Sequence, residues 1–559
     1  MPAKHKEKKT YLMNKTHLYR ELSAKYTNIV YFCLFLCVFM ACFLPPIKGF
    51  HDNLIKPKWF FTELITIITF IILLLHFYVS RLFTESKSYE VTIKEELSKA
   101  IVCISFLEVI YVICNIICNH QEIIKGTFEN PSGLAFCLSA LLPFHFYLFI
   151  IYKKNKSIRN LIIALFLITI SIILLTQSRT GWIYITLFLM IVTNKIKVFD
   201  KIIRIPIYII ITIVLSILVC KFKSNSSSGR LFILERSWEL IKENPICGHG
   251  PGGFIQNYML KQAEFFKTNY NNHYAWLADE IQHPLNEFIL SWVEFGIGGV
   301  LIHIGIFIIL FILLRKDKDY FSFSLNLSLL SLFIFSIFSY PMVYPLFWII
   351  LILCSFTAFK NKIANTYYSC FIKYKSPITF ICIGGLLLRL IFLIYSFKYE
   401  NAWYNIYQKS LRGHSKEVMP YYDKLYSHFH SNVYFLYNYA SEQFYAGRND
   451  SALNTAKECL SKWPSYNLSL LMGDICRNSN KFNESITFYE QAHYMCPIRF
   501  APLEGLYYSY KQLGIDSKTD SIADIIAHKT IKINSGEIQR IKKEILDDIQ
   551  QLKKENENK

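Results

Sequence analysis

Residues 224–254 read SNSSSGRLFILERSWELIKENPICGHGPGGF, and residues 279–299 read DEIQHPLNEFILSWVEFGIGG. With the segment that joins them, they form the only extended polar stretch of the first 398 residues, and long apolar runs lie on both sides. A loop of this length that is rich in Gly, Arg, His and carboxylates is more often functional than a simple connection. The sequence therefore predicts a hydrophobic scaffold that holds chemistry in this loop.

The composition indicates a polytopic membrane protein with a soluble part. Of the 559 residues, 53% are hydrophobic and only 18% are charged, as in proteins with many apolar spans. The net charge of +19 does not predict nucleic-acid binding, because Lys and Arg cluster in short loops where cytoplasmic retention of positive charge explains them. The 15 cysteines show neither a disulfide framework nor zinc-ligand spacing. The cysteines therefore predict no zinc site. No cofactor is expected.

Eleven apolar runs are long enough to cross a bilayer. They lie at about 27–45, 59–79, 100–118, 131–152, 158–176, 180–196, 203–220, 285–314, 321–339, 342–359 and 377–397. No small-residue cleavage site follows the first run, so we expect an uncleaved span there. The fold class predicted from these runs is all-α, a polytopic helical bundle of about eleven spans.

The basic clusters fix the expected orientation of the spans. They lie at the N-terminus and in the loops near 153–156, 195–204, 315–318 and 360–375. With eleven spans, all of these loops fall on the side of the N-terminus, which is the cytoplasmic side. The turn 177–181, the loop 221–284 and everything after residue 398 are then predicted on the outer face.

Four parts make up the expected domain organisation. They are a basic cytoplasmic N-terminus (1–26), a transmembrane domain (27–397) with the outer loop 221–284, C-terminal helical repeats (398–534) and a charged helical tail (535–559).

The C-terminal part contains an internal repeat. Segment 439–464 aligns on segment 472–497, and weaker copies lie near 402–436 and 501–534. The aligned pairs are Gly447 with Asn480, Ala452 with Ser485, and Pro464 with Pro497. This pattern resembles tetratricopeptide repeats, which bind a peptide or a neighbouring protein. A plain packing role is the alternative.

His283 is the candidate catalytic residue of the loop. It precedes Pro284, and Pro favours the first position of a helix, so we expect His283 at or just before a helix N-terminus. The positive end of the helix dipole disfavours imidazolium and leaves the ring neutral, as a general base requires. Glu280, Glu287 and Glu294 would share one helical face if the helix extended back past the Pro. A His that only caps the helix is the alternative.

Arg179 and Arg230 are candidate phosphate-binding residues. Arg179 interrupts the apolar hairpin LLTQSRTGWIYITLFL, and a cation at the rim of a bundle is costly unless it snorkels or pairs with an anion. Arg230 follows the sequence SNSSSG, which predicts a turn on the same face. Two guanidinium groups that face one cleft suit a pyrophosphate. Interfacial anchoring is the alternative for each Arg alone.

The glycine cluster from Gly248 to Gly253 predicts a tight reversal with close backbone approach. It lacks the preceding strand and the lysine of a nucleotide-binding loop. His249 within it is a secondary candidate. Gly296, Gly298 and Gly299 are expected to let the eighth span pack closely against its neighbours.

Four groups of these residues resemble the O-antigen ligase superfamily. They are Thr127-Phe128-Glu129-Asn130-Pro131; Ser178-Arg179-Thr180-Gly181; Ser228-Gly229-Arg230 with Trp238, Pro245 and Gly248-His249-Gly250-Pro251-Gly252; and His283-Pro284-Leu285-Asn286-Glu287 with Glu294-Phe295-Gly296-Ile297-Gly298-Gly299. The superfamily includes lipopolysaccharide O-antigen ligases, O-antigen polymerases and bacterial protein O-oligosaccharyltransferases. The resemblance is most specific over about 127–300.

This resemblance implies a metal-independent, inverting glycosyltransferase of the bacterial inner membrane. It would transfer a glycan from an undecaprenyl-pyrophosphate-type carrier to an acceptor hydroxyl on the periplasmic face, where the C-terminal domain would also lie. Arg179 and Arg230 would stabilise the pyrophosphate, and His283 would take the acceptor proton. Many family members place His and Asn next to each other, whereas two residues separate them here. The supporting residues would be Ser178, Glu280, Asn286 and Glu287.

The acceptor and two other functional classes stay open at this point. Ligases use a lipid A core sugar, polymerases another carrier-linked glycan, and protein transferases a Ser or Thr hydroxyl, and the repeats favour a protein partner or acceptor slightly. A carrier or flippase for lipid-linked glycans would show polar sites at mid-membrane and a duplicated architecture. An assembly scaffold would depend on the repeats and tolerate substitution of His283, Arg179 and Arg230.

Overall fold

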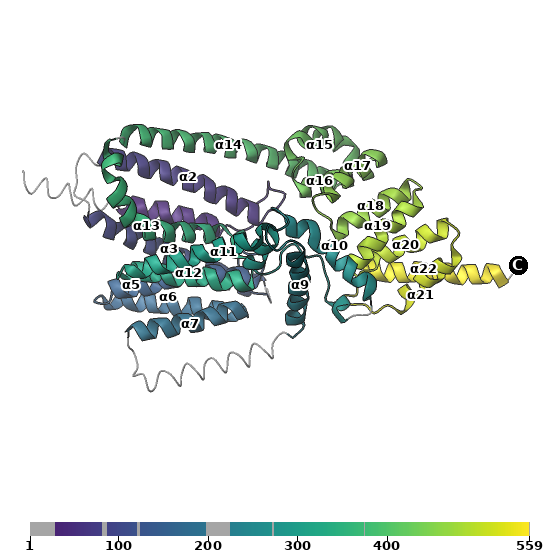
Figure 1. Cartoon of the computed structure of the whole chain (residues 1–559), viewed down its shortest axis with the longest axis horizontal. Helices are drawn as coiled ribbons and strands as arrows, with labels where there is room; N and C mark the ends of the chain where they lie inside the picture. Colours follow the sequence, from purple (N-terminus) through teal and green to yellow (C-terminus); the bar gives the residue numbers. More distant parts are fainter. Residues whose placement is uncertain are drawn as a thin grey trace, which may run out of the picture. The chain divides into compact units, whose positions relative to one another are not determined.

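The computed structural model describes residues 28–80, 87–119, 123–196, 224–270, 273–373 and 375–557. Within these ranges every regular element is a helix, and no β-strand occurs. The chain divides into two compact units, Met1–Val219 with Gly305–Asn401 and Cys220–Ile304 with Ala402–Lys559. The all-α fold expected for a polytopic membrane protein is confirmed (Figure 1).

The first unit is a bundle of apolar helices. Its elements are a helix at Asn28–Cys42, α2 (Ile55–Ser80), α3 (Lys87–Asn119), α4 (Pro131–Leu141), α5 (Pro143–Ile151), α6 (Lys156–Leu175), α7 (Arg179–Ile196), the end of α11 (Glu287–Lys316), α12 (Tyr320–Phe338), η2 (Pro341–Val343), α13 (Pro345–Lys373) and most of α14 (Lys375–Ser410). Seven stretches of the described chain are long and apolar enough to cross a membrane. The stretch Pro131–Ile151 is the most enclosed of them, so it forms the centre of the bundle.

Ten of the eleven predicted spans coincide with helices of the described chain. The remaining one, at 203–220, lies outside the described residues. The predicted span at 131–152 is divided into α4 and α5 at Leu142. Pro143 explains the division, because it has no backbone N–H for the helical ladder.

The second unit joins the polar loop to the C-terminal helices. The loop contributes α9 (Ser224–Glu243), α10 (Gly253–Thr268), η1 (His273–Trp276) and the start of α11. The later helices are α15 (Ser415–Phe429), α16 (Val433–Tyr445), α17 (Asn449–Leu460), α18 (Tyr466–Asn478), α19 (Phe482–Met495), α20 (Ala501–Gln512), α21 (Asp516–His528) and α22 (Gly536–Glu557).

One apolar core holds the loop and the C-terminal helices together. Phe254 and Tyr258 of α10 and Val293 of α11 pack with Tyr466 of α18 and Met495 of α19, and all five side chains are almost completely buried. Burial on this scale stabilises each side chain by about 1.5–3 kcal/mol. Because they share a core, the loop and the C-terminal helices belong to one compact unit, and their placement on the outer face stays a prediction.

The C-terminal helices form pairs that recur at a nearly constant interval along the chain. The turn within each pair contains one residue with a positive φ, at Gly413, Gly447, Asn480 and Gly514. Glycine adopts this conformation freely and Asn tolerates it better than most residues. The aligned small residues Ala452 and Ser485 are completely buried. The helices thus follow the alignment expected from the sequence, and assignment to the tetratricopeptide class stays a prediction.

Candidate functional site

His283 lies in an irregular segment that ends where α11 begins. Asn286 caps α11, because its Oδ1 accepts hydrogen bonds from the backbone N–H groups of Phe288 at 2.9 Å and Ile289 at 3.0 Å. The prediction that Pro284 opens the helix is wrong. Leu285 has a φ of +57°, so the chain reverses between the Pro and the cap.

This reversal also corrects the expected grouping of carboxylates. The helix starts at Glu287 and does not extend back past Pro284, so Glu280 does not share a helical face with Glu287 and Glu294. Asn286, whose role the sequence left open, has a structural role at the helix start.

His283 is paired with a buried carboxylate. Its Nδ1 accepts a hydrogen bond from the backbone N–H of Leu285 at 2.9 Å, so the proton of the neutral ring resides on Nε2. Nε2 lies 3.4 Å from Oε2 of Glu287, whose side chain is 2% exposed. A carboxylate in this place orients the imidazole.

Backbone strain adjoins two of the predicted site positions. Among the described residues, the non-glycine positions with positive φ are Gln177, Leu285 and Asn480. Gln177 directly precedes Ser178, and Leu285 contacts His283, whereas Asn480 forms a repeat turn. A left-handed conformation costs a residue such as Leu about 1–2 kcal/mol. Strain of this kind concentrates at functional sites.

The glycine cluster packs on a kink in α11. Gly296 has φ 65° and ψ −165° inside the helix, and a Cβ there would lie 1.9 Å from the carbonyl oxygen of Ile246. A Cβ on Gly248 would lie 2.5 Å from the backbone of Glu294, whose carbonyl accepts the N–H of Gly250 at 2.9 Å. The tight reversal with close backbone approach is confirmed. The backbone N–H groups of this reversal donate to carbonyl groups of α11 that lose their helical partners at the kink.

Gly298 and His249 were two further candidates in this region. A Cβ on Gly298 would meet nothing within 4 Å, so no close packing explains that glycine. His249 is a structural residue, because its Nε2 contacts the carbonyl oxygen of Leu240 at 2.9 Å and its Nδ1 contacts Asn244 Nδ2 at 3.4 Å. A carbonyl oxygen only accepts, so Nε2–H donates and both ring nitrogens are engaged.

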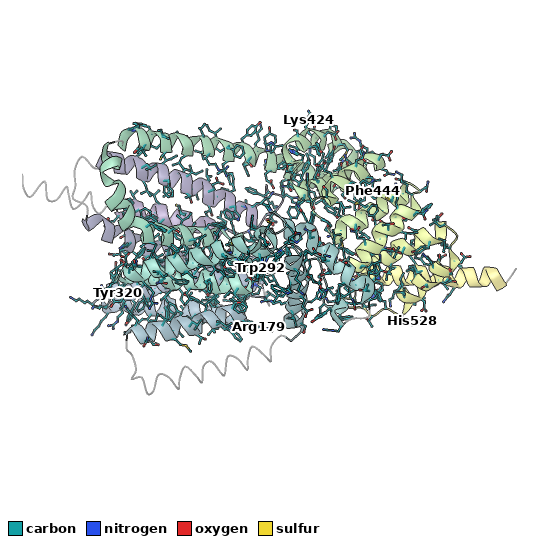
Figure 2. All side chains as sticks on the ribbon, viewed as in Figure 1. Arg179, Trp292, Tyr320, Lys424, Phe444 and His528 are labelled. Atoms are coloured by element: carbon teal, nitrogen blue, oxygen red, sulfur yellow. The ribbon has the colours of Figure 1, made fainter. Side chains whose placement is uncertain are left out.

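Ser178 and Arg179 lie at the start of α7 in the first unit. Ser178 is buried, and its Oγ accepts the backbone N–H of Gly181 at 3.4 Å. A Cβ on Gly181 would lie 3.0 Å from Ile173 Cγ2 and 3.3 Å from Ala135 Cβ, so this turn packs closely on α6 and α4. Arg179 is the half-buried first residue of α7 (Figure 2). The turn therefore fixes the backbone position from which the Arg179 side chain extends.

Arg230 lies within a helix. The sequence SNSSSG was expected to form a turn, but α9 begins at Ser224 and runs through it. Ser and Asn are favoured at the N-cap of a helix, and the amphipathic stretch that follows extends the helix. Arg230 is half-buried in the second unit, to which His283 also belongs, whereas Arg179 belongs to the first unit.

Glu280 is bound by a C-terminal helix. Its Oε2 accepts a hydrogen bond from Asn467 Nδ2 at 3.0 Å. Burial raises the pKa of Glu280, and the nearby Arg499 opposes this shift. Nothing in the sequence around Glu280 signalled this contact, because Asn467 is 187 residues away along the chain.

The region of the site matches one known family. Residues 163–304 fit the model of a family described as O-antigen ligase. This stretch of the chain is similar to the O-antigen ligase family. No curated protein matches the chain. The resemblance drawn from the sequence is thus confirmed for this region.

All seven predicted site residues lie in the O-antigen ligase region. The family supports membrane-embedded glycan transfer of the O-antigen ligase or polymerase kind, with a lipid-linked glycan and an acceptor as substrates. The region extends from α6 into α11 and ends at residue 304. The C-terminal helices therefore lie outside the matched region.

Proposed function

We propose that the protein transfers a glycan from a polyprenyl pyrophosphate carrier, of the undecaprenyl type, to an acceptor hydroxyl on the periplasmic face of the bacterial inner membrane. The observation that carries this proposal is the pair of His283 and buried Glu287 within the O-antigen ligase region. The reaction is an inverting displacement that needs neither metal nor cofactor.

His283 acts through Nδ1. The lone pair that accepts the Leu285 N–H in this structure is the one that accepts the proton of the acceptor hydroxyl. The hydroxyl oxygen forms a bond to the anomeric carbon as the bond from that carbon to the pyrophosphate oxygen breaks on the opposite face. Glu287 stabilises the imidazolium through Nε2–H. This step breaks the hydrogen bond from the N–H of Leu285 to Nδ1, and relief of the left-handed backbone of Leu285 would offset part of its cost.

Arg179 and Arg230 bind the leaving group. Negative charge develops on the pyrophosphate as the glycosidic bond breaks, and guanidinium groups grip phosphate oxygens in pairs. Ser178 supports this role by capping the turn from which Arg179 extends.

An O-antigen ligase would use a lipid A core sugar as the acceptor. A polymerase or a protein O-oligosaccharyltransferase would use the same donor and base with another hydroxyl. These choices are separated by offering each acceptor in turn.

Buried charges in the first unit do not favour a carrier or flippase. Lys58 and Glu108 are both buried in the bundle, but each binds the backbone of a connecting segment. Lys58 Nζ donates to the carbonyl of Leu44, and Glu108 Oε1 accepts the N–H of Thr127 at 2.9 Å. They hold loops in place, which explains their burial without a transport path.

The proposal is tested with purified protein, lipid-linked glycan and acceptor, by measuring release of the polyprenyl pyrophosphate. We expect His283→Ala and Glu287→Gln to lower kcat by about 10²–10⁴, and Arg179→Ala and Arg230→Ala to weaken carrier binding as well. His414→Ala is the matched control, since that ring is half exposed. Unchanged turnover in both His283→Ala and Arg179→Ala would contradict the proposed site, and no turnover with any acceptor would favour a carrier or a scaffold.

A further inference from the structure

Four donors from the C-terminal helices bind one irregular segment of the loop, residues 276–282. The contacts are Tyr434 Oη to Gln282 Oε1 at 2.9 Å, Asn467 Nδ2 to Glu280 Oε2 at 3.0 Å, Arg499 Nη2 to Asp279 Oδ1 at 2.6 Å, and Lys532 Nζ to the carbonyl oxygen of Trp276 at 2.8 Å. All donors belong to the C-terminal helices and their connections, and all acceptors belong to the loop.

The donors recur with the period of the repeats. They are evenly spaced along the chain, at positions 434, 467, 499 and 532, and Tyr434 and Asn467 are each the second residue of the first helix in a pair. Along the loop the acceptors follow in the opposite order, from Gln282 back to Trp276. The segment therefore runs antiparallel to the array and is contacted at intervals of about one repeat length. Helical-repeat proteins use such surfaces to bind peptides.

One ion pair joins the segment to the array. Asp279 and Glu280 are adjacent acids, and the guanidinium of Arg499 is held by Asp279 and by the ring of Tyr466, 4.6 Å from its centroid. Charge-assisted hydrogen bonds of this kind are about twice as strong as neutral ones.

A buried amide ties the same segment to α19. Gln262 is completely buried, and its Nε2 donates to the carbonyl oxygens of Asp279 at 3.0 Å and Met495 at 2.6 Å. The segment, α10 and α19 are thus connected beneath the surface contacts as well as through them.

His283 lies between two anchors. The preceding residue, Gln282, is bound by Tyr434, and on the other side of His283 Asn286 caps α11. We infer that the C-terminal helices bind segment 276–282 as a ligand in cis and thereby position His283. The docking is independent of the activity, whereas the role of His283 rests on the proposed function.

Docking is tested by hydrogen–deuterium exchange on the full chain. We expect Arg499→Asp and Asn467→Asp, which set like charges against the two acids, to accelerate exchange of residues 276–286 at least about tenfold, the effect of losing a charge-assisted hydrogen bond. Arg448→Asp is the matched control, because this exposed Arg pairs with Asp423 at 3.3 Å and not with the loop. Exchange that stays unchanged in Arg499→Asp and Asn467→Asp would overturn the docking.

Positioning is tested by the division between kcat and KM. We expect Arg499→Asp to lower kcat about 10- to 100-fold, because small displacements of a catalytic group cost this much, with an unchanged KM for the lipid-linked glycan. The charge swap of Asp279→Arg with Arg499→Asp should restore kcat and slow exchange. Tyr434→Phe should lower kcat about 3- to 10-fold, whereas Tyr445→Phe, at an exposed position of the same helix, should not.

The results separate the two claims. If Arg499→Asp accelerates exchange of residues 276–286 but leaves kcat unchanged, the claim that the C-terminal helices position His283 is overturned. Loss of kcat together with a raised KM and a lower melting temperature, without rescue by the charge swap, would also overturn it. Accelerated exchange in a chain that transfers no glycan even when unaltered would refute the proposed function while supporting the docking.

Discussion

The two ring nitrogens of His283 have different partners, and this difference decides what the residue can do. Nδ1 faces a backbone N–H and Nε2 faces a buried carboxylate. A base needs one lone pair that substrate can reach and one N–H that a carboxylate can stabilise. In the proposed mechanism the ring takes this arrangement once the N–H of Leu285 leaves Nδ1.

Glu280 provides a test at this scale. Its folded-state pKa is raised by burial, so its contribution to stability is present at low pH and is lost as pH rises through that pKa. We expect docking of segment 276–282 to weaken as the pH rises above 4.5, the ordinary pKa of a Glu side chain, measured by exchange of these residues relative to their intrinsic rates.

The matched variant for this prediction is Glu280→Gln. Gln keeps an acceptor for Asn467 without a desolvated charge, so the pH dependence should disappear and glycan transfer should be retained. Loss of transfer in Glu280→Gln, with the loop still docked, would give Glu280 a role in the chemistry instead.

At the scale of single elements, α11 combines a cap, a kink and a membrane span. Asn286 begins it, and Gly296 breaks it where the carbonyl of Ile246 approaches. The glycine cluster and the kink therefore depend on each other, although they are distant along the chain.

Gly296→Ala tests this dependence. A Cβ would lie 1.9 Å from a carbonyl oxygen at a φ of +65°, so we expect the free energy of unfolding to fall by about 2–4 kcal/mol. Gly298→Ala is the control, since nothing lies within 4 Å of its Cβ. Equal thermal stability of the two variants would show that the close approach is absent in solution.

The sequence predicted elements whose signal is local. The spans follow from the length of apolar runs, and the repeat turns follow from residues such as Gly447 that tolerate positive φ. The predicted start of α11 at Pro284 was wrong. Whether Pro284 or Asn286 precedes the helix depends on the backbone conformation of Leu285. Contacts such as Arg499 with Asp279 join residues 220 positions apart and have no local signal. The shared period of the four donors was the one clue available in advance.

At the scale of the whole molecule, residues 163–304 match the O-antigen ligase family, and the C-terminal helices lie outside this match. The C-terminal helices and the loop share one core, and the loop carries the candidate base. The stability of that core therefore affects the site.

His493 makes this core sensitive to acid. Burial lowers its pKa to about 3, with a smaller effect from Lys529. Below about pH 6.5 the unfolded chain binds a proton that the folded chain excludes, so stability should fall by about 1.4 kcal/mol per pH unit. We expect the melting temperature of this unit to drop between pH 7 and pH 5, and less so in His493→Gln. An equal drop in both proteins would place the acid sensitivity elsewhere.

The most direct test of the account is a single-turnover measurement of glycan transfer from a polyprenyl pyrophosphate donor, with the anomeric configuration of the product determined by NMR. We predict an inverted configuration, and a rate at least about 10² lower in His283→Ala while its exchange pattern stays that of the unaltered chain. A product with retained configuration, or equal rates in the two proteins, would contradict the account.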